Sequence, residues 1–233
     1  MKTSVLSLGG SIIAPDKVNS AFLSDFVKSV ESYFEDNDDR LILVCGGGAP
    51  ARDYQKAYRE TVKAELQDAN AQDWLGIKAT HLNAQIVKAV LGPLCKDPVV
   101  TDPTDESVAF TGRVLVAGGW KPGFSTDTDA VYLARRFNAK TVVNLSNISK
   151  VYTDDPRKNP DAKPIDSISW EDFRKMVGDE WVPGKNTPFD PIASRLAQQA
   201  GIRVICSDGR NVENTIKILK GQPFEGTVIG SCV

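Results

Sequence analysis

Glycines gather at three places in this sequence, each directly after a short apolar segment that favours a β-strand. The clusters are Gly9-Gly10 after Thr3–Leu8, Gly46-Gly47-Gly48 after Arg40–Cys45, and Gly118-Gly119 after Val114–Ala117. In an open α/β sheet, ligands bind beyond the carboxyl ends of the strands. Glycine allows close backbone approach there, and helix N-termini add a positive dipole, so such loops suit phosphate. One Gly-Gly pair would predict only a turn, but three at one sheet edge indicate an anion site for phosphoryl transfer.

The glycine pattern matches neither of the two common nucleotide motifs, because the chain has no GxxxxGK[ST] loop and no GxGxxG fingerprint. Two other segments carry side chains suited to a nucleotide. In Gly118–Ala134, Ser125 or Thr126 can cap a helix and place Asp127 in its first turn. In Asn144–Pro156, Tyr152 can pack on a base and Asp155 can accept hydrogen bonds from ribose or amine donors. The alternatives are a helix cap alone and an ordinary loop.

These loops need strands and helices to position them, and the two kinds of segment alternate along the chain without an internal repeat. Further strands are expected at Thr141–Leu145, Ile202–Cys206 and Thr227–Ile229. Helices are expected at Asn19–Phe34, from about Ala51, and at Trp74–Leu91, Thr126–Phe137, Trp170–Val177, Pro191–Ala200 and Val212–Leu219. The helix 74–91 is expected to carry Leu75, Leu82, Ile86, Val87 and Val90 on one face. The alternation predicts an α/β fold whose mainly parallel sheet is covered on both faces.

Composition narrows the function classes. The chain has 233 residues and a net charge of −2, which argues against a general affinity for nucleic acid or an anionic membrane. No apolar stretch is long enough for a membrane span. The four cysteines, Cys45, Cys95, Cys206 and Cys232, are far apart, which favours a reduced, cytoplasmic protein. The single histidine, His81, excludes sites that need a histidine pair, and it is interpreted as a surface or packing residue.

Six segments, in order, resemble the amino-acid kinase superfamily, and specifically the archaeal-type uridylate (UMP) kinases. They are SLGGSI (7–12), GGGAPARDY (46–54), DWLGIKATHLNA (73–84), GGWKPGFSTD (118–127), VYTDDP (151–156) and FDPIAS (189–194). The closing EGTVI is also similar to the family. The resemblance covers nearly the whole chain and implies a three-layer α/β/α sandwich as a single domain, 1–233. It divides the chain into an acceptor-binding half, about 1–135, and an ATP-binding half, about 136–233.

The resemblance also implies roles for individual residues. The acceptor UMP would contact Gly47, Arg52, Asp73, Gly76, Thr80, Gly119, Ser125 and Thr126, with Arg52 on its phosphate and Asp73 on its ribose. ATP would contact Gly9, Gly10, Ser11, Gly48, Asn147, Tyr152 and Asp155. The transfer centre would hold Gly9, Gly10, Asp190 and Lys185. From the residues alone, Arg52 can equally be a solvated surface side chain, and Asp190 can be a helix cap.

The chain departs from the family pattern where a cation is expected. Asn147-Ile148-Ser149-Lys150 replaces N-V-D-G, Ala49 replaces a lysine, and His81 replaces an arginine. The first strand has Ser7 where the bacterial type has its lysine. Three loop lysines are candidates for the missing cation: Lys121, Lys150 and Lys185, the last just before Asp190.

The resemblance implies a cytoplasmic enzyme of pyrimidine biosynthesis that transfers the γ-phosphoryl group of ATP to UMP, giving UDP and ADP. Mg²⁺ is expected to travel with the ATP phosphates, without a dedicated metal site on the protein. The implied assembly is a homohexamer, with neither nucleic acid nor membrane as partner. Two alternatives are a related small-molecule kinase of the same superfamily and an oxoanion-binding protein similar to the molybdenum/tungsten storage proteins.

Overall fold

A mainly parallel sheet of seven strands forms the centre of the molecule, which we describe from a computed structural model for residues 1–156, 158–178 and 187–230. The strands lie in the order β3-β2-β1-β4-β8-β9-β7. Their bounds are β1 Thr3–Leu8, β2 Arg40–Cys45, β3 Val114–Ala117, β4 Thr141–Ser146, β7 Ser167–Ile168, β8 Arg203–Asp208 and β9 Thr227–Ile229. Within this sheet, as described, β8 and β9 are the one antiparallel pair. Strands β5 (Val151–Tyr152) and β6 (Pro164–Ile165) form a separate antiparallel ribbon.

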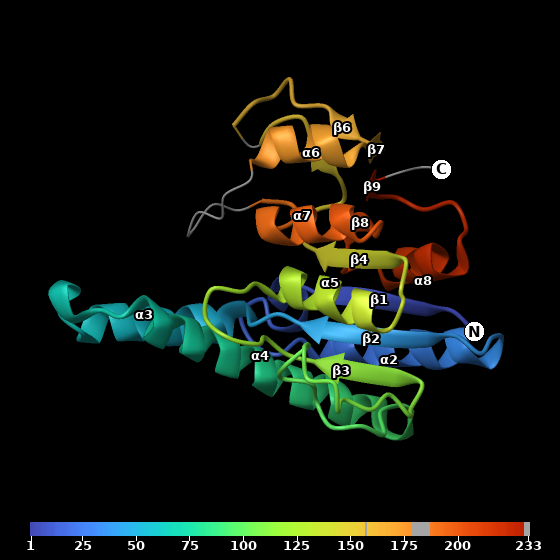
Figure 1. The fold of residues 1–233 in the computed structure, drawn as a ribbon, viewed down its shortest axis with the longest axis horizontal. Helices are drawn as coiled ribbons and strands as arrows, with labels where there is room; N and C mark the ends of the chain where they lie inside the picture. The colour runs from blue at the N-terminus through green and yellow to red at the C-terminus, as the bar shows by residue number, and fades with distance from the viewer. Residues whose placement is uncertain (157, 179–186, 231–233) are drawn as a thin grey trace.

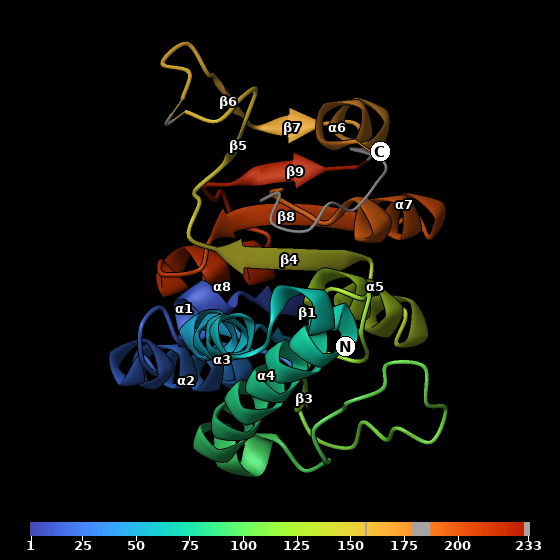
Figure 2. The ribbon, with the colours of Figure 1, turned by 90° about the vertical axis from the view of Figure 1, so that its left-hand side faces the viewer.

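Helices cover both faces of the sheet, which confirms the predicted three-layer α/β/α architecture (Figures 1 and 2). Residues of α2 (Ser20–Glu35), α4 (Ala69–Leu91) and α8 (Val212–Lys220) pack with one face of the sheet. Residues of α5 (Thr126–Arg136), α6 (Trp170–Val177) and α7 (Pro191–Gln199) pack with the other. Because the central strands are covered on both faces, β1, β2 and β4 are buried along nearly their whole length, including the polar residues Ser4, Ser7 and Asn144.

Capping side chains begin the helices close to where the sequence predicts them. Asn19 accepts a hydrogen bond from the Phe22 N–H at the start of α2, and Asn211 accepts one from Asn214 at the start of α8. Ser125, rather than Thr126, caps α5 by accepting the Thr128 N–H at 3.2 Å. Two short helical segments, α1 (Gly10–Ile13) and the 3₁₀ turn at Ala64–Leu66, are absent from the prediction because they have no apolar period of their own.

The predicted face of the helix at 74–91 is right at Val87 and Ile86, which pack in the core, and wrong at Leu82 and Val90. Leu82 and Val90 are 68% and 42% exposed, and the helix packs on the sheet through residues that include Ile77, Ala84 and Val87. Small and polar side chains occupy much of this buried face, so a count of large apolar residues places the face incorrectly. The helix also begins earlier, at Ala69, capped by Asp68.

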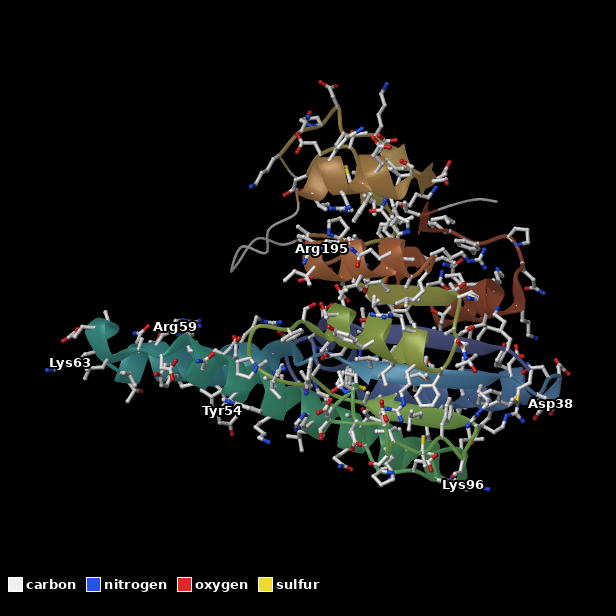
Figure 3. All side chains as sticks on the ribbon, viewed as in Figure 1. Asp38, Tyr54, Arg59, Lys63, Lys96 and Arg195 are labelled. Carbon is white, nitrogen blue, oxygen red and sulfur yellow. The ribbon has the colours of Figure 1, made fainter. Side chains whose placement is uncertain are left out.

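Helices α3 (Gly48–Thr61) and α4 extend beyond the sheet as a projecting arm (Figure 1). Figure 3 shows Tyr54, Arg59 and Lys63 on this arm, away from the strands. Along the described parts of the chain, no helix is long and apolar enough to span a membrane. Cys45, Cys95 and Cys206 are free and buried, and Cys232 lies outside the described residues.

Candidate active site

The glycine loops after β1 and β2 meet in direct backbone contact. A Cβ on Gly10 would lie 1.9 Å from the Gly48 nitrogen, and one on Gly46 would lie 2.4 Å from the Gly10 nitrogen. Gly48 also has φ +67°, a backbone conformation that side chains other than glycine rarely adopt. Glycine is therefore required at this contact, and the predicted convergence of these two loops at one sheet edge is observed.

Side chains of α4 hold the glycine loops of β2 and β3 in place. The Asn83 amide donates to the carbonyl oxygens of Gly46 and Gly47 at 2.7 and 3.1 Å. Thr80 Oγ1 accepts the Gly119 N–H at 2.7 Å, and His81 Nε2 lies 2.7 Å from the Gly119 oxygen. His81 is thus a packing residue, as predicted, with a specific bond to the loop. Asn83 was missed, although a buried Asn on an apolar helix face signals such a contact.

A cavity of about 340 Å³ opens where these loops meet the arm. All eight residues predicted to contact UMP line it: Gly47, Arg52, Asp73, Gly76, Thr80, Gly119, Ser125 and Thr126. Asp190 and Gly48 line it as well. Five lining residues were not predicted, namely Ala51, Gln55, Ile77, Gly123 and Phe124. Four of them lie inside the quoted motifs but had no role assigned, and Gln55 lies just after the second motif.

Two polar side chains at the cavity already have partners that hold them there. The Arg52 guanidinium is exposed and donates to the Pro15 carbonyl at 2.9 Å. Asp73 Oδ2 accepts the Gly123 N–H at 3.0 Å, which ties α4 to the loop before α5. An exposed guanidinium with further N–H groups suits phosphate, because its planar fork matches the phosphate oxygens.

Two aspartates meet beside the cavity: Asp190 lines it, and the Asp127 carboxylate accepts the backbone N–H of Asp190. Asp127 Oδ1 accepts the Ser7 hydroxyl at 3.1 Å, and its Oδ2 accepts the Asp190 N–H at 3.3 Å. Burial, together with the negative charge of Asp190, raises the pKa of Asp127 to about 6. Asp190 caps α7 by accepting the Ala193 N–H at 2.8 Å, so its capping role and its place at the cavity hold together. Asp127 therefore contacts a residue that lines the cavity, which its expected place in the first turn of a helix did not reveal.

The residues predicted for ATP lie mostly outside this cavity. Of these residues, only Gly48 lines it. The N–H groups of Gly9 and Gly46 already donate to the carbonyls of Leu145 and Leu8, both at 2.8 Å. The N–H groups of Gly10 and Gly47 have no such carbonyl partner among the described residues, and the contact of these loops with phosphate stays a prediction.

Three of the other residues predicted for ATP follow β4, and Ser11 follows β1. Asn147 is exposed in the turn after the strand, Tyr152 is half-buried in β5, and Asp155 starts the turn that follows. Ser11 is half-buried in α1.

The candidate cations have different surroundings. Lys150 forms an ion pair with Asp166, and the Lys121 ammonium lies 3.7 Å from the centre of the Trp120 ring. Lys185 lies outside the described residues. Across the described segments, no three His, Cys, Asp or Glu side chains are grouped to hold a metal ion.

A larger cavity, of about 670 Å³, lies at the opposite end of the sheet, lined by Lys2, Arg40, Lys140 and Arg203. Residues just after the C-termini of α5 and α7, Phe137–Asn138 and Gly201, also line it. Cations are favoured at helix C-termini, which accounts for the basic side chains in this cavity. The cavity lies far from the glycine loops and is not part of the candidate site.

The chain belongs to the amino acid kinase family, whose model matches residues 2–208. It is 35% identical over 231 residues to a uridylate kinase from Methanospirillum hungatei JF-1, covering 98% of this chain and 95% of the relative. A uridylate kinase from Pyrococcus abyssi is 31% identical over 97% of this chain and 98% of its own. The crystal structure of uridylate kinase from Archaeoglobus fulgidus superposes with a TM-score of 0.82 at 32% identity, covering 99% of this chain and all of that one. The resemblance found in the sequence is confirmed.

Proposed function

We propose that this protein is an ATP-dependent UMP kinase that converts UMP and ATP to UDP and ADP. The observation that carries the proposal is the convergence of all eight predicted acceptor residues on one cavity. Its relatives along the full chain are named uridylate kinases. These names do not favour the alternative of an oxoanion storage protein.

In the proposed reaction, a phosphate oxygen of UMP attacks the γ-phosphorus of ATP, and the bond to the β–γ bridging oxygen breaks. The attacking oxygen is already anionic, so no general base is required, and the protein contributes positioning and charge stabilisation. Arg52 binds the UMP phosphate and Asp73 binds the ribose. Asp190, at the inner side of the cavity, orients groups at the transfer centre.

ATP is proposed to bind on the other side of the transfer centre, against Gly9, Gly10, Ser11, Asn147, Tyr152 and Asp155. The division into an acceptor half, about 1–135, and an ATP half, about 136–233, stays a prediction, because Gly9, Gly10 and Ser11 of the first half are proposed to contact ATP and Asp190 of the second half lines the acceptor cavity. Mg²⁺ is proposed to arrive on the ATP phosphates, as it does in many phosphoryl-transfer sites, and to neutralise charge there. Lys185, together with Arg52, remains the proposed source of protein cations, and the cytoplasmic location stays a prediction.

The arm supports self-association, in line with the predicted homohexamer. Trp74, Leu82 and Val90 of α4 are 43%, 68% and 42% exposed and lie on one i±4 ridge of the helix. Large apolar side chains gathered on one helix face mark a surface for another protein chain. We propose that a second copy of this chain covers this ridge.

The function is tested by a coupled assay of ADP release with UMP, CMP, AMP, carbamate and isopentenyl phosphate as acceptors. Turnover at least about a hundredfold faster with UMP than with the non-nucleotide acceptors supports the proposal. The absence of turnover with every nucleoside monophosphate, together with molybdate or tungstate retained after dialysis, would favour the storage alternative.

A further inference from the structure

Asp129 of α5 is a buried carboxylate that the proposed reaction does not use. Its side chain is fully buried, and Oδ2 accepts the Trp120 N–H at 3.1 Å. Oδ1 has no hydrogen-bond partner, and it is the one buried side-chain polar atom of the described chain in this condition. An unpaired buried carboxylate oxygen costs free energy, so a residue of this kind needs a reason to be present.

The bond from Asp129 ends on the loop that forms one wall of the acceptor cavity. Trp120 directly follows Gly119, and the loop continues to Gly123 and Phe124. Gly119, Gly123 and Phe124 line the cavity. The Trp120 ring packs on Phe124, with ring centres 4.8 Å apart, and its indole donates to Asp102. By fixing the position of Trp120, Asp129 therefore also fixes the loop that forms this wall of the cavity.

The charges around Asp129 are mostly negative. Asp127 on the same helix and Asp102 disfavour its ionisation, and burial does so most. Helix α7, which packs on α5, contributes Asp190 at its start and Arg195, which lies on its exposed side (Figure 3). Strands β1 and β4 carry no ionisable residue within their bounds, and β2 carries only Arg40 and Cys45, at its ends. These surroundings raise the pKa of Asp129 to about 7.

We propose that Asp129 is a positioning residue for the acceptor loop, and that the loop is held more firmly when this carboxylate is ionised. A hydrogen bond to an ionised acceptor is roughly twice as strong as a neutral one. The loop 118–125 would then be fixed best above neutral pH, and the KM for UMP would depend on the proton at Asp129. This inference rests on the proposed function.

The test compares Asp129→Asn and Asp129→Leu with the wild type from pH 5.5 to 8.5. Asn keeps an acceptor for the Trp120 N–H but carries no charge. Comparing the variant with the wild type at each pH cancels the effect of the titration of UMP itself. The ratio of KM for UMP, Asn variant to wild type, is expected near 1 at pH 5.5 and about threefold to tenfold at pH 8.5, with kcat little changed. Leu removes the acceptor, so its KM should be raised at every pH.

A second readout does not need activity. Exchange of the Trp120 amide hydrogen, followed by NMR at pH 8, should be faster in the Asn variant than in the wild type, and the Asn variant also covers the case in which Leu fails to fold. A ratio of KM that stays flat with pH, together with unchanged Trp120 exchange, would overturn the inference. If the wild type shows no turnover of UMP, the proposed function is overturned. The comparison of Trp120 amide hydrogen exchange would still decide the role of Asp129.

Discussion

The hydroxyl of Thr80 accepts a hydrogen bond from the backbone N–H of Gly119, with 2.7 Å between the two heavy atoms. This bond joins α4 to the loop after β3, at residues 39 positions apart in the sequence. Both residues line the acceptor cavity. The distance between the arm and the acceptor loop is therefore set in part by a single side chain.

Replacing Thr80 by Val should leave the buried Gly119 N–H without its acceptor. Such a loss costs about 1–3 kcal/mol. We expect the KM for UMP to rise about tenfold, at nearly unchanged KM for ATP, in steady-state kinetics. Thr80→Ser keeps the hydroxyl and is the matched control, so an equal effect of Val and Ser would contradict this role.

Removing the guanidinium in Arg52→Ala should weaken UMP binding and leave ATP binding near normal. A hydrogen bond to a charged group is worth about 1.5–3 kcal/mol, so the KM for UMP should rise about tenfold to a hundredfold. Arg59→Ala is the control, because Arg59 lies two turns further along α3 and does not line the cavity. Unchanged UMP kinetics in Arg52→Ala would remove this residue from the phosphate site.

The charge of Asp190 should matter for the chemical step more than for binding. Asn preserves the helix cap that Asp190 provides to the Ala193 N–H, so Asp190→Asn isolates the loss of charge. We expect kcat to fall at least tenfold, with less than a threefold change in either KM, in pre-steady-state and steady-state assays. Thermal unfolding at matched pH checks that the cap is intact, and an unchanged kcat would place Asp190 outside the transfer centre.

The stability of the folded protein should fall as pH rises from about 5 to 8. Asp127 and Asp129 have pKa values raised to about 6 and about 7, so the unfolded chain loses these protons at lower pH than the folded one. The loss of stability from ionising these two buried carboxylates is absent below the pKa of an aspartate in the unfolded chain, near 4. It is complete above the raised pKa values of the two groups in the folded protein. Urea unfolding should show a decrease on the order of a few kcal/mol over this range. The double variant Asp127→Asn/Asp129→Asn should flatten the curve, and an equally steep curve would contradict the assignment.

The sequence was enough to predict six of the seven strands of the main sheet, because these are short, largely apolar segments between turn residues. Strand β7 was missed, since its two residues, Ser167–Ile168, are too few to show a pattern. Thr3–Leu8, Arg40–Cys45 and Val114–Ala117 occur as predicted, and the glycines after them mark the site. Contacts between segments far apart in the chain could not be predicted. Asn83 reaching Gly46, and Asp127 meeting Ser7, depend on how α4 and α5 cross the sheet, which no local pattern encodes.

The exposed face of α4 was also beyond sequence analysis, because Leu82 has the same local pattern whether it contacts the sheet or another chain.

Changing Leu82 tests the proposed assembly. Leu82→Glu places a charge on the exposed apolar ridge, where burial of an unpaired carboxylate against a second copy is unfavourable. We expect light scattering after size exclusion to show a smaller species than the wild type at micromolar concentration, with the monomer fold retained by circular dichroism. Met176→Glu makes a similar change at a 36% exposed residue of α6 and should leave the assembly unchanged. If Leu82→Glu runs at the wild-type mass, the ridge is not the surface that joins the copies.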